Sequence, residues 1–291
     1  MRYILLIILL FQFSCNFSGK PIDPDPEFVH IGTFNIAWLG DGVKDRVRRR
    51  VEDYARIAEL IRDSDAEILA LQEIENEGAL NGLKRYLPGW NFAIADTDGP
   101  QNLAFLYKDY IELDTVFTYQ AVKVNKRTRP ALIAKAKMGN FDFYLMNVHF
   151  KSTSRYDDTE EKRQASFKMR RFQSKAVVNW IDSILSNDIE KDLIILGDFN
   201  DNPDRGEKSN ISLIVDNNEM NFLTRGLRSC KNPNWDMIDH IIVTNSSYDR
   251  YFRNSRRVVS QYSMFNDDEA KRISDHCPVI ATFDVRPEDN D

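Results

Sequence analysis

The chain has 291 residues, 42% of them apolar, so it can bury one large hydrophobic core. Its formal charge of −6, from 45 acidic and 39 basic residues, excludes a protein that binds nucleic acid through a generally basic surface. Local basic runs remain at residues 46–50, 123–129 and 162–171. On helices such runs are more often solvated faces than binding sites.

The N-terminus predicts an exported protein. Residues 1–14 place Arg2 before an apolar run that is too short for a membrane span, which is typical of a signal peptide. Ser14 before Cys15 resembles a bacterial lipoprotein cleavage site, and lipidated Cys15 would anchor the protein to a membrane. The alternative is an ordinary secreted protein. Residues 15–27, with three prolines and three acids, predict a tether.

From residue 28 onward, short apolar runs alternate with helical periodicity, which predicts one α/β layered domain over residues 28–286 and a tail at 287–291. The predicted strands are 28–36, 68–71, 103–107, 131–136, 141–148, 193–196, 240–243 and 279–283. One predicted helix spans 43–62, with Val47, Val51, Ile57 and Leu60 on its apolar face. Another runs from 158 to 185, with Asp158 and Glu161 as a capping box.

Polar residues recur at the ends of these apolar strands, where α/β folds gather functional groups. They are Asn35, Glu73, His149, Asp198, Asn200, Asp239, Asp275 and His276. Each alone is an ordinary turn former or structural residue. Together they form a recurring pattern that predicts one site.

The residue types in this set indicate phosphoryl chemistry. Carboxylate and amide oxygens suit Mg²⁺, Mn²⁺ or Ca²⁺ rather than zinc, and cysteine ligand pairs are absent. His149 and His276 add groups that exchange protons near neutral pH, and Asp239 would orient one of them. Such a site suits metal-assisted attack of water on a phosphate.

Six motifs occur in the order and spacing of a known family. They are Phe34-Asn35, Leu71-Gln72-Glu73, Val148-His149, Gly197-Asp198-Phe199-Asn200, Ile238-Asp239 and Ser274-Asp275-His276. They resemble the endonuclease/exonuclease/phosphatase, or deoxyribonuclease I-like, superfamily over residues 28–285. The resemblance implies an α/β (α+β) four-layer sandwich, with two packed mixed β-sheets flanked by helices and a site at one edge.

The resemblance also implies roles for single residues. Glu73 would be the principal metal ligand, with Asn35 and Asp275 beside it. Asp198 and Asn200 would position the attacking water and the phosphate. The further expected roles are a His276–Asp239 catalytic pair, His149 as second catalytic histidine and Arg129 as phosphate contact.

One departure bears on substrate choice. Gln101 stands where deoxyribonuclease I-like enzymes carry an acid that orients the first histidine, which weakens the assignment of His149 as general acid. Gln101 and Asn102 could instead present amides to a phosphate, and we predict substrate binding for Asn102. The competing interpretation is an ordinary polar residue at the start of a strand.

We therefore expect a divalent-metal-dependent phosphodiesterase that uses Mg²⁺, with Mn²⁺ or Ca²⁺ as alternatives. The predicted activity is that of an exported endonuclease on DNA rather than RNA, acting as a monomer without a protein partner. A sphingomyelinase-like phospholipase C is the alternative, because Tyr262, Met264 and Phe265 could form a membrane-contacting loop. A non-catalytic surface binding protein is disfavoured, since packing alone would not preserve these ionisable groups.

Two cysteines besides Cys15 remain. In an oxidising compartment Cys230 and Cys277 could form a disulfide. Because Cys277 precedes an apolar run, we instead expect a buried free thiol at the start of a strand.

Overall fold

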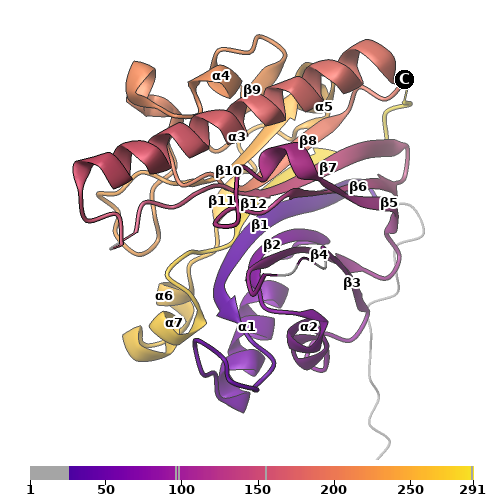
Figure 1. Cartoon of the computed structure of the whole chain (residues 1–291). Helices are drawn as coiled ribbons and strands as arrows, with labels where there is room; N and C mark the ends of the chain where they lie inside the picture. The colour runs from indigo at the N-terminus through magenta and orange to yellow at the C-terminus, as the bar shows by residue number, and fades with distance from the viewer. Residues whose placement is uncertain (1–25, 96, 98, 155, 290) are drawn as a thin grey trace, which may run out of the picture.

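The computed structural model describes residues 26–291 except 96, 98, 155 and 290. Two six-stranded sheets pack against each other, and helices cover both outer faces (Figure 1). The first sheet has the order β11-β12-β1-β2-β4-β3, and the second has β5-β6-β7-β8-β10-β9. In each sheet one central pair, β1 with β2 or β7 with β8, is parallel, while the other pairs are antiparallel. The predicted four-layer sandwich is confirmed.

The strands of the first sheet are β1 (Phe28–Leu39), β2 (Ile68–Ile74), β3 (Trp90–Ile94), β4 (Asn102–Lys108), β11 (Arg257–Val258) and β12 (Val279–Asp284). Those of the second are β5 (Glu112–Tyr119), β6 (Ala131–Met138), β7 (Phe141–His149), β8 (Leu193–Asp198), β9 (Met220–Phe222) and β10 (Asp239–Thr244). The α-helices are α1 (Val51–Asp63), α2 (Glu77–Lys84), α3 (Glu160–Asn187), α4 (Ser212–Val215), α5 (Asn245–Arg250), α6 (Gln261–Met264) and α7 (Asp267–Ile273). Two 3₁₀ turns, η1 (Gln120–Val122) and η2 (Pro203–Lys208), complete the described elements.

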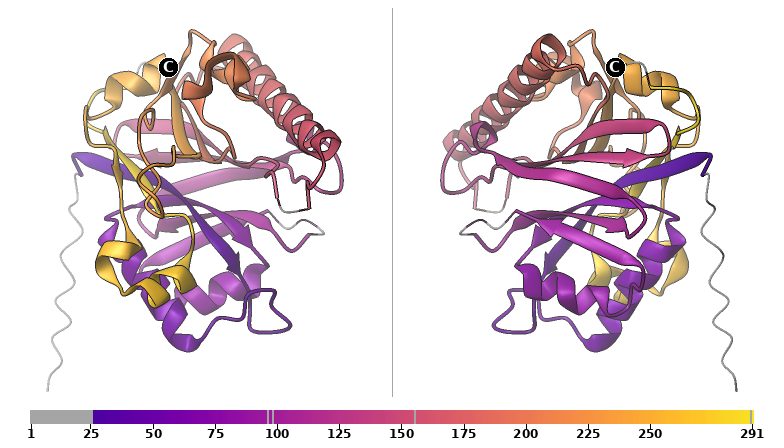
Figure 2. Two further views of the ribbon diagram at one scale, coloured as in Figure 1. Left: turned by 90° about the vertical axis from the view of Figure 1, so that its left-hand side faces the viewer. Right: turned by 90° about the vertical axis from the view of Figure 1, so that its right-hand side faces the viewer.

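Three apolar layers hold the sandwich together. The central layer lies between the sheets and includes Ile31, Phe105, Phe143 and Leu196. A second layer joins the first sheet to α1 and α2, and a third joins the other sheet to α3 and α4. Side views place the long helix α3 on the outside of one sheet and α1 with α2 outside the other (Figure 2). Each sheet carries apolar side chains on both of its faces. One face therefore packs against the other sheet, and the opposite face packs against helices.

The first predicted helix was too long. Residues 43–50 are irregular, and α1 begins at Val51. The expected apolar face fails at that end, because Val51 is 68% exposed while Ile57 and Leu60 are fully buried. The reason is tertiary: the neighbouring Arg49 is buried, where its guanidinium donates to the backbone carbonyls of Ile36 and Ala37.

The long helix α3 is confirmed, but its cap differs from the prediction. Thr159 is the N-cap, and its side chain accepts a hydrogen bond from the backbone N–H of Lys162. Asp158 forms an ion pair with the Lys162 side chain instead. Strands β3 and β5 were not predicted, because their half-exposed faces lack a continuous apolar run.

Membrane attachment remains a prediction. The signal segment and Cys15 lie outside the described residues. Within the described part of the chain, no helix is both long and apolar enough to cross a membrane. Met264 and Phe265 pack partly buried against the layer beneath the first sheet, so both contribute to the core.

Candidate active site

The centre of the site is the C-terminal end of β8. Asp198 ends this strand, and its neighbours across the sheet are His149 on β7 and Asp239 on β10. Gly197 makes this arrangement possible, because a Cβ atom there would lie 1.9 Å from the carbonyl oxygen of Val148. Glycine therefore lets β7 and β8 approach at the point where their polar ends meet.

The other sheet reaches the same point through Asn35. Its Nδ2 donates to Asp198 Oδ2 over 3.1 Å, and its Oδ1 accepts from the backbone of Ala37 over 3.0 Å. The register of β1 shifts just after Asn35, where Ala37 and Trp38 have positive φ angles. This bulge turns the end of β1 toward the edge of the sandwich.

Glu73 and Asn200 also have positive φ angles, of 63° and 51°. Such strained backbone is common at functional sites. Asn200 donates its backbone N–H to Asp198 Oδ1 over 2.8 Å, while Glu73 Oε1 lies 3.8 Å from His149 Nε2. Burial raises the pKa of Glu73, although the positive charge of Arg129 opposes this shift.

His276 and Asp239 form the predicted pair. His276 Nδ1 lies 2.8 Å from Asp239 Oδ2, which joins the loop before β12 to the start of β10. Burial alone would lower the pKa of His276, but the charges of Asp239, Asp198 and Asp275 outweigh it and raise the pKa to about 10. The imidazole is therefore protonated at neutral pH.

The pKa shifts of Asp198 and His149 favour the neutral form of each side chain, whereas that of His276 favours the charged form. Burial, reinforced by the charge of Asp239, raises the pKa of Asp198 to about 7. Burial and then the charge of Arg129 hold the pKa of His149 well below its usual range. His149 Nε2 lies 3.4 Å from Asp198 Oδ2, and its buried Nδ1 has no hydrogen-bond partner among the residues that the structure describes.

Arg129 lies at the predicted place. Its guanidinium donates to the carbonyl of His149 and, over 2.8 Å, to Gln101 Oε1. Gln101 thus holds the arginine, while no acid in the described part of the chain bonds to Nδ1 of His149. Gln101, which stands in place of the family's acid, therefore contacts Arg129.

Asn102 does not join the site, and its predicted substrate contact is wrong. The side chain is only 3% exposed. Both the oxygen and the nitrogen of its amide form hydrogen bonds with nearby loop residues. Its oxygen accepts from Thr97, and its nitrogen donates to the carbonyls of Glu75 and Gly99. A polar residue at the start of a strand has here the ordinary structural role.

The expectation of a free thiol is also wrong. Cys230 and Cys277 form a disulfide that joins two segments 47 residues apart, with a Cα–Cα distance of 6.2 Å. The residues beside these cysteines also interact, since Lys231 Nζ lies 3.2 Å from Asp275 Oδ2. Sequence analysis missed this because strand packing brings residue 230 to the start of β12.

The donor set fits a divalent cation. Among the described residues, polar atoms of Asp198, Asp239 and His276 lie within 4.8 Å of one another, and because His276 is protonated the two carboxylates are the cation donors of this group. Asp239 Oδ1 is buried there without a hydrogen-bond partner, so it has capacity for a cation. Two predicted ligands lie at the margin of this group: Glu73 is beside His149, and Asp275 Oδ1 is 4.0 Å from His276 Nε2.

Several supporting residues escaped the sequence analysis. Gln72 and Asn147 join the two sheets beneath the site through a 2.8 Å hydrogen bond. Their signal was a polar residue inside an apolar strand. Arg49, which donates to the carbonyls of Ile36 and Arg272, gave no such signal, because its partners are distant in sequence.

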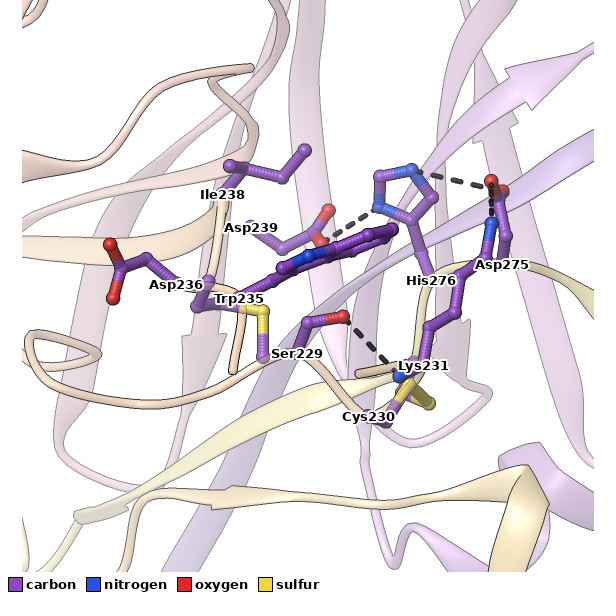
Figure 3. Close-up of a pocket in the computed structure, with 11 residues that line it drawn as sticks. Ser229, Cys230, Lys231, Trp235, Asp236, Ile238, Asp239, Asp275 and His276 are labelled. Carbon is purple, nitrogen blue, oxygen red and sulfur yellow. Dashed lines mark hydrogen bonds and ion pairs between the residues drawn. A yellow bond between two sulfur atoms is a disulfide. The ribbon is translucent and has the colours of Figure 1, made fainter. Parts of the chain in front are cut away.

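Two pockets flank the reacting groups. One, of about 340 Å³, is lined by Glu73, Arg129 and His149 together with further basic residues. The other, of about 310 Å³, is lined by Asp239, His276 and the disulfide. Trp235, which is 55% exposed, extends across this second pocket toward His276 (Figure 3). Asp198 itself is buried and is not among the residues that line either pocket.

Comparisons with known proteins agree with this architecture. Truncated TDP2 from Caenorhabditis elegans matches with a TM-score of 0.63 and 14% identity over 88% of this chain and 98% of that one. An endonuclease/exonuclease/phosphatase from Bacteroides vulgatus matches with a TM-score of 0.63 and 19% identity over the same shares. A mannosyl-6-phosphatase from Bacteroides thetaiotaomicron gives 0.59 and 15% identity, over 87% and 98%.

At these identities the likeness shows the fold. No curated protein matches the chain by sequence. The family described as "Endonuclease/Exonuclease/phosphatase family" matches residues 21–277, which is most of the chain. The order of the six motifs, the paired sheets and this match have one explanation: the chain belongs to the endonuclease/exonuclease/phosphatase family, whose members are hydrolases of phosphoester bonds.

Proposed function

We propose that this protein is a divalent-metal-dependent phosphodiesterase and that it acts on DNA as an exported endonuclease. The observation that carries the hydrolytic part of the proposal is the convergence of the His276–Asp239 pair and buried Asp198 at one end of the sheets. His276 has a pKa of about 10 beside Asp239, while buried Asp198 has a pKa of about 7. Separated pKa values of this kind identify acid and base partners in hydrolytic sites.

Each residue then has a role that follows from its surroundings. Asp198, fixed by Asn35 and the backbone of Asn200, accepts the proton of the attacking water. Protonated His276 donates a hydrogen bond to a phosphoryl oxygen and stabilises the charge that develops there. Arg129 contacts another phosphate oxygen, and neutral His149 offers its Nε2–H to the same group.

The cation would be held by the carboxylates of the site, with Glu73 as the principal ligand and Asn35 and Asp275 nearby. When bound, a divalent ion neutralises phosphate charge and activates water. The raised pKa of Glu73 supports this role, because burial of this carboxylate outweighs the opposing charges of Arg129 and His276. Mg²⁺ suits such an oxygen set, and Mn²⁺ or Ca²⁺ are alternatives.

A small phosphomonoester is the second candidate substrate. The acidic total charge disfavours a long polyanion, and one similar structure is titled a mannosyl-6-phosphatase. A phospholipid is less favoured, since Met264 and Phe265 of the suspected membrane loop belong to the core. DNA remains the first choice, because one pocket is lined by His149 and another by His276, and the one lined by His149 is basic.

The test is parallel hydrolysis of plasmid DNA, RNA, sphingomyelin and p-nitrophenyl phosphate with Mg²⁺, with Ca²⁺ and with chelator. Metal-dependent nicking of plasmid that is lost in His276→Ala would support the nuclease. Cleavage of the monoester with intact plasmid would move the enzyme to the phosphatases. Activity that survives chelation would contradict the metal requirement.

Export and lipid anchoring are part of the same proposal. The signal-like segment before Cys15 supports them, and so does the Cys230–Cys277 disulfide, because disulfides persist in oxidising compartments. Fractionation of cells that express the full chain tests this, with labelled palmitate as the readout. The label should enter the wild type and be absent from Cys15→Ser, whereas equal labelling would contradict lipidation of Cys15.

A further inference from the structure

The two pockets beside Asp198 differ in charge. The larger pocket, called here the cationic pocket, is lined by Arg46, Arg127, Arg129 and Lys151, with Glu73 as the carboxylate among its lining residues. The smaller pocket contains Asp236, Asp239 and Asp275 against Lys231. Each carboxylate of the smaller pocket is paired with a cation, whereas the cationic pocket has four cations and one carboxylate among its lining residues.

Among the described residues, the cations of the cationic pocket outnumber the acids that pair with them. Asp157 lies 3.5 Å from Lys151 Nζ and 3.8 Å from Arg127 Nη2. It also accepts the backbone N–H of Ser154 over 2.8 Å. One carboxylate is thus shared by two cations and an amide, which leaves an excess of positive charge.

Arg46 adds a further cation from a different part of the chain. Its guanidinium lies 4.5 Å from the centre of the Trp38 ring, and no carboxylate among the described residues pairs with it. Trp38 follows Asn35 on the bulged end of β1, so the stacked pair is tied to the same strand end as the reacting groups. Arg46 and Arg127 are both exposed, and substrate can reach them.

The lining connects this charge to the reaction. Glu73, Arg129 and His149 line the cationic pocket and also surround Asp198. A phosphate held at Arg46 and Arg127 would therefore lie in the same pocket as Arg129 and His149, which are proposed to contact the reacting phosphate. Two basic runs in the sequence, 46–50 and 123–129, each contribute to it, whereas Arg170 of the third run is buried and bonded to Lys151 O.

We infer that Arg46, Arg127 and Lys151 form a subsite for a second phosphate group of the substrate. The enzyme would then prefer phosphoesters that carry a neighbouring phosphate, as nucleic acids do, over compounds with a single phosphate. This deepens the proposed function, and the preference for a phosphodiester rests on it.

The first experiment compares two substrates that differ by one phosphate: thymidylyl-thymidine dinucleotides with and without a terminal phosphate. The wild type should cleave one of the two terminally phosphorylated isomers at least ten times more efficiently than the unphosphorylated dinucleotide. Arg46→Gln and Arg127→Gln should each reduce this preference severalfold, through KM rather than kcat, because they remove charge–phosphate contacts.

Matched controls separate this subsite from a general effect of charge. The control variants are Arg48→Gln, in the same loop as Arg46, and Lys126→Gln, next to Arg127. Both controls are exposed, do not line the cationic pocket, and change the net charge by the same amount. They should leave the preference unchanged. Equal losses in controls and pocket variants would overturn the subsite.

A binding measurement keeps the two proposals distinguishable. With chelator present, calorimetric titration compares thymidine 3′,5′-bisphosphate with thymidine 5′-monophosphate. The bisphosphate should bind at least ten times more tightly to the wild type, and Arg127→Gln should remove this margin. Equal affinities would overturn the subsite. A clear margin in a protein that cleaves no phosphodiester would preserve the subsite and contradict the proposed function.

Discussion

The two histidines of the site lie at equivalent places, each at the end or start of a buried strand, yet they have opposite character. His276 faces the carboxylate of Asp239, and its pKa rises to about 10. Burial without an acid on Nδ1, next to Arg129, holds the pKa of His149 well below its usual range. One residue type is therefore charged in one place and neutral in the other.

The comparison teaches that strand position and residue type do not set a role. The role of each histidine is set by the charged neighbour that the tertiary structure places beside it. That neighbour comes from a different part of the chain in each case. Charged His276 suits stabilisation of a developing negative charge, whereas neutral His149 suits a fixed hydrogen bond.

Removing the charged histidine should have the largest effect. We expect His276→Gln to lower kcat/KM by about 1,000-fold, because the variant cannot carry positive charge toward the phosphate. Steady-state kinetics on the substrate identified by the hydrolysis test measure this. Asp268→Asn, on the exposed surface of α7, is a control that should retain activity. A loss below tenfold in His276→Gln would contradict the assigned role.

Removing the partner of His276 should make the two histidines alike. Asp239→Asn is expected to lower kcat/KM by about 100-fold, because the pKa of His276 loses its main raising charge. NMR titration of the His276 ring should detect the fall from about 10 directly. An unchanged pKa would show that Asp239 is not the cause.

The same substitution should change how stability depends on pH. The pKa of His276 is about 6.5 in the unfolded chain and about 10 in the folded protein. This shift contributes stability that is complete below about pH 6.5 and is lost as the pH rises to about 10. Thermal unfolding of the metal-free protein should therefore separate wild type from Asp239→Asn most at pH 6. The two curves should converge near pH 10, and a constant difference would contradict the linkage.

Substitution of His149, the neutral histidine, should have a smaller effect than substitution of His276. His149→Gln should lower kcat/KM by only about tenfold, since glutamine retains a hydrogen-bond donor of similar reach. The pH profile of kcat/KM should keep its shape, because His149 is neutral throughout the working range. A new titration step in the variant, or a loss as large as that of His276→Gln, would contradict this.

The smallest effect on activity is expected for the disulfide. Cys230→Ser combined with Cys277→Ser should reduce kcat/KM a few-fold, by loosening the segment that holds Lys231 against Asp275. Stability should fall more clearly, by about 4 kcal/mol for a 47-residue separation in the chain-entropy model. Denaturant unfolding measures this, with the reduced wild type as the matched comparison. Equal stability would exclude a structural role.

The sequence by itself determined the layered fold and most members of the site. Apolar runs that end in polar residues predicted eight of the strands, since periodicity and strand-end chemistry are local properties. The same pattern named Asn35, Glu73, His149, Asp198, Asp239 and His276, all of which the structure brings to one edge of the sandwich.

Only the tertiary structure decided how these residues differ. The partner that charges His276, the loop that occupies Asn102 and the disulfide at Cys277 all involve contacts between distant or separately folded segments. The irregular course of residues 43–50 depends likewise on carbonyls that Arg49 meets after folding. Burial and charge at a site are sums over such neighbours, and a linear pattern does not contain them.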